Sequence, residues 1–581
     1  MIDIKKIKIA LNKQNKSYAV ILFFLWLIFT FMELIGITSI PIFLSLLLES
    51  ENSFKLPILK DYLLYFGDLE KKEILLYFVG IIILIFLIKN IFFAFLVYFE
   101  QMTARSITLD IKKRTFSYYF RKPFKEQLNS NSSDVIRKIT LDAANAVTYV
   151  NSSLTLFFQL VLTSSIALYL LYIDFFLTIT ILMFFILILL TIYFFSSKRL
   201  SLYGKLKQKY AGEGIKIVNE GINNIKEVII YKKINFLNSL YSKLQKYQQD
   251  QVLKISMFKR LPRGIYELLT ITFMMFVVLF KIFINEESVE STIVFLTLII
   301  ISLARILPSI NLITLNLSNI KSTEYSFNLI TNNFFDLKRF YQTVDGSNLK
   351  DNSFKFVNNI SFNQVSFRFH HDKQLLNNIS FKIEKNSIIG IFGESGSGKS
   401  TILNLLTGLL KPTKGNISID KFDLKDDKIK DLWQNIIGYI PQDNFLLDDT
   451  VKKNIIFSNK FEEVNQTNLD KAIYLAKIDK FISSLKDGIE TKIGDRGINI
   501  SGGQRQRIGI ARALYNDPEV LIFDEATSSL DFETENEILD EIYAIKNKTI
   551  IMISHNLESL NRCQKILKLK DGIVSDLKFN Q

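Results

Sequence analysis

The sequence predicts an α-helical membrane domain followed by a soluble α/β domain. Six apolar stretches of spanning length all precede residue 315. After residue 355, short β-rich runs and turns alternate with helical segments, which is typical of an α/β domain with a mainly parallel sheet. Hydrophobic residues make up 49% of the 581 residues and Phe alone counts 50, more than a soluble core needs.

The predicted spans are Ala19–Leu48, Ile74–Tyr98, Leu154–Ile173, Phe175–Phe195, Ile265–Ile284 and Ile293–Ile313. Short connections follow the first, third and fifth spans, whereas the connections 99–153 and 196–264 are long and basic. By the positive-inside rule, both termini and the two long loops lie in the cytoplasm. We expect the loops to continue the spans as helices, and the sixth span to end near Pro308, before a polar helix and linker.

The charge distribution points to a membrane rather than to nucleic acid. The formal net charge is +14, but residues 1–350 carry 40 Lys and Arg against 25 Asp and Glu, and residues 351–581 carry 31 against 32. The basic half is therefore the apolar half, and we expect no nucleic-acid partner. The single Cys563 excludes an intramolecular disulfide, and with three His it leaves too few ligands for a Cys/His metal site.

A phosphate-binding loop is predicted after the strand Ile388–Phe392. The match to G-x-x-x-x-G-K-[ST] consists of Gly393, Glu394, Ser395, Gly396, Ser397, Gly398, Lys399 and Ser400, with Thr401 opening an apolar helix. The glycines let backbone N–H groups surround phosphate oxygens, the lysine reaches the β- and γ-phosphates, and the serine ligates Mg²⁺. The strand-loop-helix context predicts ATP and Mg²⁺ as cofactors.

Two further segments predict chemistry on that nucleotide. The buried strand Val520–Phe523 ends in Asp524, a candidate Mg²⁺ ligand, and Glu525, a candidate general base for the attacking water. Ser501, Gly502, Gly503 and Gln504 open the next helix upstream, where a hydroxyl and free N–H groups at the positive helix end form a second anion site.

The Ser501–Gln504 run ahead of the Asp524 strand resembles the signature of ATP-binding cassette (ABC) proteins, and the six-span layout resembles ABC exporters. The resemblance implies an ABC-exporter membrane domain and an α/β P-loop nucleotide-binding domain. It also implies that Gln442 senses Mg²⁺, that His555 contacts the γ-phosphate, and that Asp531 lies in the D-loop. Phe369 takes the place of the usual adenine-stacking Tyr; a core-facing Phe is the alternative. With one cassette and six spans, a homodimer is implied, in which the signature of one protomer closes over the nucleotide of the other.

The predicted organisation is a transmembrane domain at 1–330, a linker at 331–354 and a cassette at 355–581. Segments near Asn131–Asp142 and Asn219–Tyr231 resemble coupling helices. The predicted location is the bacterial inner membrane, with both termini and the cassette cytoplasmic.

Ionisable residues inside the spans are candidate cargo contacts. Arg305 in the sixth span and Lys89 in the second are the substrate candidates, and Glu33 in the first is a further one; an ion pair between spans is the alternative. An arginine in the pathway suits an anionic head group. Stretches at Phe116–Pro123, Asn131–Arg137 and Leu261–Glu267 resemble flippases of lipid-linked oligosaccharides. The predicted function is ATP-driven export or flipping of such an amphiphile; the alternatives are a peptide or drug exporter and, in another class, a non-transporting regulator or channel.

Overall fold

The computed structural model describes residues 3–47, 71–128, 130–173, 175–283, 289–344, 354–369, 375–458, 464–494, 500–525, 532–545 and 547–577. The chain divides into two compact units. One consists of Met1–Lys122 and Ser130–Arg339, and the other of Pro123–Asn129 and Phe340–Gln581. The second unit therefore takes a short segment from the first long loop as well as the C-terminal part of the chain.

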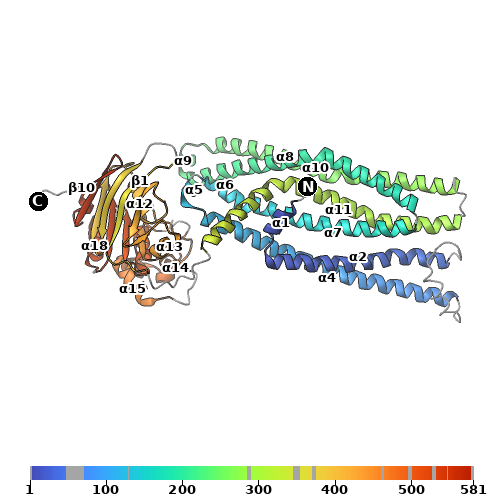
Figure 1. The fold of residues 1–581 in the computed structure, drawn as a ribbon, viewed down its shortest axis with the longest axis horizontal. Helices are drawn as coiled ribbons and strands as arrows, with labels where there is room; N and C mark the ends of the chain where they lie inside the picture. Colours follow the sequence, from blue (N-terminus) through green and yellow to red (C-terminus); the bar gives the residue numbers. More distant parts are fainter. Residues whose placement is uncertain are drawn as a thin grey trace. The chain divides into compact units, whose positions relative to one another are not determined.

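The first unit is a set of long helices that run side by side (Figure 1). They are α2 (Lys13–Leu47), α4 (Lys71–Arg121), α7 (Ala143–Ile173), α8 (Phe175–Asn223), α10 (Ile234–Phe283) and α11 (Val289–Val344). Each predicted span lies in one of them as far as the described residues reach, and the helices extend far beyond the apolar parts, so the helical loops are confirmed. The short elements are α1 (Ile4–Ala10), α6 (Ser132–Arg137), the π-helix η1 (Lys138–Asp142) and α9 (Ile225–Ile230).

Within the described residues, five helical stretches are long and apolar enough to cross a membrane: Lys13–Ile40, Leu75–Arg121, Ser132–Ile173, Ile186–Asn223 and Ile300–Asp336. The predicted fifth span is helical up to Phe283 inside α10 but is not among the five, and its last residue, Ile284, lies outside the described part. Large apolar side chains such as Leu76 and Phe194 are more than 70% exposed on this unit, which is the surface a bilayer covers.

The predicted sixth span, expected to end near Pro308, and the polar helix expected after it are both part of α11. Helix α11 continues through this proline. Pro308 has no N–H to donate to the preceding turn, yet the hydroxyl of Ser309 donates to the carbonyl oxygen of Arg305 at 3.2 Å. The carbonyl oxygen that Pro308 leaves without its helical donor is that of Ala304, so the Ser309 hydrogen bond adds a contact one residue beyond it.

The second unit contains two sheets. The six-stranded sheet has the order β10-β9-β3-β8-β7-β6, and the four-stranded sheet the order β2-β1-β4-β5. In the larger sheet every pair is parallel except β10 with β9, and the smaller sheet is antiparallel. The strands are β1 (Asn359–Phe367), β2 (Leu376–Glu384), β3 (Ile388–Gly393), β4 (Lys414–Ile419), β5 (Phe422–Asp423), β6 (Ile437–Ile440), β7 (Val520–Asp524), β8 (Thr549–Ser554), β9 (Lys565–Lys570) and β10 (Ile573–Leu577). The predicted mainly parallel core sheet is confirmed.

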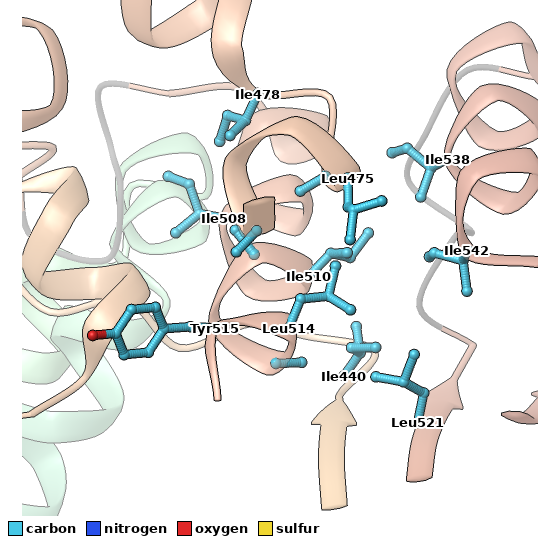
Figure 2. Packing of buried hydrophobic residues seen from close by; sticks show 14 of the residues in the cluster. Ile440, Leu475, Ile478, Ile508, Ile510, Leu514, Tyr515, Leu521, Ile538 and Ile542 are labelled. Carbon is cyan, nitrogen blue, oxygen red and sulfur yellow. The ribbon is translucent and has the colours of Figure 1, made fainter. Parts of the chain in front are cut away.

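Helices complete this unit: α5 (Phe124–Leu128), α12 (Lys399–Leu406), α13 (Asp427–Asn435), α14 (Val451–Ile456), α15 (Gln466–Leu475), α16 (Asp479–Ser484), α17 (Gly502–Tyr515) and α18 (Phe532–Ala544), with 3₁₀ turns η3 (Gly488–Glu490) and η5 (Glu558–Leu560). Strand β7 has both faces covered: Val520 and Ile522 join the core under α12, while Leu521 and Phe523 join the core under α17. Figure 2 shows Ile508, Ile510 and Leu514 of α17 among Leu475, Ile538 and Leu521 from neighbouring elements. These buried faces fix the strand ends on which the candidate site is built.

Candidate functional site

The predicted phosphate loop joins β3 to α12. Gly396 and Gly398 have φ of +80° and +106°, in the left-handed region that L-side chains avoid. Gly398 is the N-cap of α12, and no side chain caps the helix there. The first backbone N–H groups of α12 therefore remain available to an anion, as at other helix N-termini that bind phosphate.

The residues present fit a bound triphosphate. Ser397 Oγ is buried and has no hydrogen-bond partner among the residues that the structure describes, which leaves a donor for a phosphate oxygen. A Cβ on Gly393 would lie 2.8 Å from the carbonyl oxygen of Leu569, so only glycine fits where the loop leaves the sheet. The Lys399 ammonium donates to the carbonyl oxygens of Gly393 and Glu394, at 2.7 and 3.1 Å, and is held under the loop.

The carboxylate of Glu525 lies among three other candidate site residues. Its Oε1 is 3.5 Å from Lys399 Nζ and 3.3 Å from His555 Nδ1. Its Oε2 accepts a hydrogen bond from Gln442 Nε2 at 3.2 Å. Glu525, His555 and Gln442 follow strands β7, β8 and β6, and Lys399 opens α12 after β3. The carboxyl ends of parallel strands meet at one edge of a sheet, which brings these residues together. Glu525 has a φ of +50°, a strained conformation of the kind that clusters at functional sites.

The neighbouring carboxylate, Asp524, accepts a hydrogen bond from the hydroxyl of Tyr439 at 3.1 Å. Burial raises the pKa of Asp524, and this hydrogen bond lowers it. Burial and the adjacent Asp524 raise the pKa of Tyr439, so the phenol keeps its proton and acts as the donor. Sequence reasoning missed Tyr439, although its position near the end of a strand that runs parallel to β7 could have indicated it.

The donors Ser400, Asp524 and Gln442 are oxygen-bearing side chains, which is the chemistry Mg²⁺ prefers. Ser400 and Gln442 are exposed and Asp524 is half-buried. No group of three or more His, Cys, Asp or Glu able to hold a metal occurs in the described part of the chain. Mg²⁺ at nucleotide sites is bound by one or two carboxylates together with phosphate oxygens and water, and Asp524 can supply such a carboxylate.

The predicted second anion site begins α17 with a capping box. Ser501 Oγ accepts from the backbone N–H of Gln504 at 3.2 Å, and Gln504 Oε1 accepts from the N–H of Ser501 at 2.9 Å. Ser501 and Gly502 are exposed. The structure therefore presents a rigid, accessible helix N-terminus at the predicted signature.

The remaining candidates differ in what the structure describes. Phe369 packs edge-on against Phe367, with ring centroids 5.0 Å apart, and is half-buried beside the core under α12. Thr401 is buried, whereas Glu394 and Ser395 are exposed in the loop. Asp531 lies outside the described residues.

In the membrane unit, Glu33 joins the two substrate candidates. Its Oε2 is 3.2 Å from Lys89 Nζ and its Oε1 is 2.7 Å from Arg305 Nε. The side chains of Glu33 and Lys89 are each 4% exposed, whereas that of Arg305 is 47% exposed. Lys89 therefore forms an ion pair between spans, which was the alternative to a cargo contact. In the triad of Glu33, Lys89 and Arg305, Arg305 is the accessible member.

Comparisons with known proteins agree with this architecture. The family model for the ABC transporter transmembrane region matches residues 7–306, and the model for the ABC transporter matches residues 376–528. A bacterial Atm1-family ABC exporter with ATP bound has a TM-score of 0.76 at 20% identity, covering 96% of this chain and 94% of that one. The phosphate loop, the strand-end carboxylates and the apolar helices define an ATP-driven membrane transporter.

The chain belongs to the ABC transporter family. Its cassette is an ATPase that uses ATP and Mg²⁺, and its first unit makes it a multi-pass membrane protein.

An export ATP-binding/permease protein of Rickettsia typhi is 28% identical over 85% of this chain and 84% of its own length. A similar protein of Rickettsia prowazekii is 37% identical, but over only 41% of this chain and 43% of its own length. The mitochondrial iron-sulfur clusters transporter atm1 of Aspergillus fumigatus is 40% identical over 38% of this chain and 30% of its own length. The Escherichia coli alpha-hemolysin translocation protein HlyB is 42% identical over 37% and 31%.

Proposed function

We propose that the protein is an exporter or flippase that works as a homodimer and couples ATP hydrolysis to movement of an anionic amphiphile. The observation that carries the proposal is the position of the Glu525 carboxylate beside Lys399, Gln442 and His555 at the phosphate loop. In this proposal residues 1–330 form the transmembrane domain, 331–354 the linker and 355–581 the cassette. Both termini and the cassette lie on the cytoplasmic side of the bacterial inner membrane.

Each site residue has a proposed role. The loop N–H groups and Lys399 bind the phosphates, and Ser400, Gln442 and Asp524 hold Mg²⁺, which would neutralise phosphate charge. Glu525 orients and deprotonates the attacking water, and the nearby His555 contacts the γ-phosphate. Phe369 stacks on the adenine, while Ser501–Gln504 and Asp531 act on the nucleotide of the partner protomer.

Two features of the single chain support the homodimer proposal. It has one phosphate loop and one signature segment with an exposed N-terminus, and in the proposed dimer the signature of one protomer closes over the nucleotide held by the phosphate loop of the other. Within the first unit, the second predicted coupling segment is also apolar and exposed: Ile225, Ile229, Ile230 and Tyr231 are 51–72% exposed. An exposed apolar patch outside the membrane marks a protein-protein contact.

The dimer can be tested by measuring the mass of detergent-purified protein with and without ATP in the Glu525→Gln background. A mass of two chains in ATP supports the proposal. A single-chain mass under both conditions at micromolar concentration contradicts it.

The ion triad supports an anionic cargo. Lys89 already neutralises Glu33, so the triad keeps a net charge of +1 that sits on the half-exposed guanidinium of Arg305. Glu33 approaches Nε, and within the described part of the chain both Nη groups remain for a bidentate contact with a phosphate or carboxylate. A lipid-linked oligosaccharide has such a group at the junction of lipid and sugar, and this cargo is our first proposal. Peptide cargo is the second, because relatives include toxin translocation proteins.

The cargo experiment is uptake in proteoliposomes containing a fluorescent lipid-linked oligosaccharide and, separately, a fluorescent peptide. We expect ATP-dependent movement of the lipid, with a loss of at least about 10-fold for Arg305→Gln, since one charge-assisted contact contributes about 1.5–3 kcal/mol. The control is Arg105→Gln, because Arg105 is exposed on α4 beyond the predicted second span. Movement of the peptide alone would replace the first cargo with the second.

A further inference from the structure

Tyr439 is the one hydrogen-bond donor recorded for Asp524 among the described residues. The phenol hydroxyl lies 3.1 Å from Asp524 Oδ2. The hydrogen bond joins residues 85 positions apart in the chain, so it depends on how the sheet is assembled.

The register of the sheet explains the contact. Strands β6 and β7 are parallel, and Tyr439 pairs with Ile522, two residues before Asp524. Side chains alternate along a strand, so Asp524 and Ile522 point to the same face, and Tyr439 points there too. Ile437 and Ile522 belong to the core under α12. That face is therefore the side where α12 and the phosphate loop lie.

The distances also match the size of a tyrosine. Neighbouring strands are about 4.8 Å apart, and two residues along a strand advance about 6.6 Å. A shorter polar side chain at position 439 would not reach a carboxylate placed diagonally across that gap. Phenylalanine would fill the same space without the donor.

We propose that Tyr439 is a positioning residue for the metal site: its hydroxyl holds Oδ2 of Asp524, which leaves Oδ1 for Mg²⁺. This inference rests on the proposed metal-binding role of Asp524. A carboxylate with one oxygen tethered loses fewer orientations when it binds a cation, and partners of this kind tune the affinity of metal ligands. Tyr439 itself touches neither metal nor phosphate in this account.

The test uses full-length protein in detergent with Mn²⁺ in place of Mg²⁺. Protein-bound Mn²⁺ is followed by electron paramagnetic resonance in the presence of a non-hydrolysable ATP analogue. The variants are Tyr439→Phe and Asp524→Asn, with Tyr474→Phe as the control because Tyr474 is 58% exposed on α15. Binding of a fluorescent ATP analogue in EDTA reports folding and metal-free affinity, and the ATPase rate is measured against Mg²⁺ concentration.

For Tyr439→Phe we expect the Mn²⁺ concentration at half-saturation to rise about 10-fold. Metal-free nucleotide affinity should stay unchanged, and excess Mg²⁺ should restore kcat. Asp524→Asn should shift the Mn²⁺ midpoint at least as far, and Tyr474→Phe should not shift it.

The results that would contradict the inference about Tyr439 can be told apart from those that would contradict the proposed role of Asp524. If Asp524→Asn shifts the Mn²⁺ midpoint but Tyr439→Phe does not, the inference is wrong and the proposed role of Asp524 stands. If neither variant shifts it, Asp524 is not the metal ligand and both fail. If Tyr439→Phe weakens metal-free nucleotide binding by the same factor, the tyrosine acts on the nucleotide and not through Asp524.

Discussion

Glu525 Oε1 lies 3.5 Å from Lys399 Nζ, and the lysine side chain is 8% exposed. The proposed general base and the phosphate-loop lysine therefore form an ion pair within one cassette. A triphosphate bound in the loop attracts the same ammonium, so the carboxylate competes with it and also repels it. Glu525 is therefore expected to affect both ATP affinity, through Lys399, and hydrolysis, as the proposed general base.

The buried ion pair between Glu33 and Lys89 is expected to stabilise the membrane unit. Glu33→Gln leaves Lys89 buried without its counter-charge, and breaking a buried pair in this way costs about 3–5 kcal/mol. We expect a lower unfolding midpoint in detergent, measured by thermal unfolding. The double variant Glu33→Gln/Lys89→Met should regain most of the loss because no buried charge is left without a partner, and the Arg305 side chain, which also loses Glu33, is 47% exposed.

The matched control for this prediction is Glu213→Gln. Glu213 is 43% exposed and lies 3.9 Å from Lys209, so its removal should leave the midpoint unchanged. Equal midpoints for Glu33→Gln and Glu213→Gln would show that the buried pair does not stabilise the unit.

Ser501 caps helix α17, and its effect on stability can be measured separately from its effect on ATPase activity. Ser501→Ala removes the acceptor for the Gln504 N–H and should cost about 1 kcal/mol. Asn465→Ala removes the equivalent cap of α15, whose side chain accepts from Asn468 N, and should cost about the same. If Ser501 also acts on the partner's nucleotide, only its variant should lose ATPase activity by 10-fold or more, about 1.4 kcal/mol or above in the barrier. Equal ATPase rates in both variants would limit Ser501 to helix capping.

The single cysteine predicts a slow labelling reaction. Burial raises the pKa of the Cys563 thiol to about 12, although a hydrogen bond with Tyr543 lowers it. The folded pKa lies above the ordinary value, so the neutral thiol persists through pH 8 and thiolate appears only as the pH rises toward the folded pKa. Maleimide labelling of native protein at pH 7.5 should be at least about 100-fold slower than that of the unfolded chain. Equal rates would contradict the burial of this thiol.

Features that depend on local pattern could be predicted from the sequence. The phosphate loop was recognisable because its glycines and Lys399 are contiguous, and the spans because hydrophobic length suffices. The triad of Glu33, Lys89 and Arg305 could be suspected residue by residue, yet its pairing could not, because it depends on how helices far apart in the chain pack.

Other features carried too little local signal. The segment 123–129 belongs to the second unit, where Phe124 packs against the core under α12. One aromatic residue in a five-residue helix does not show which unit it joins. The π-helix at Lys138–Asp142 and the helical course through Pro308 were likewise not predicted, since a proline is more often read as a helix end and a π-helix has no sequence signature.

The most direct test of the central claim is the ATPase rate and ATP affinity of purified Glu525→Gln. We predict a loss of about 100-fold or more in turnover, since a positioned base contributes 10²–10⁴-fold. ATP binding should be retained or tighter, because the neutral amide no longer competes for Lys399. Turnover near that of the unchanged protein would contradict the account, since a carboxylate at position 525 would then not be the base that drives hydrolysis.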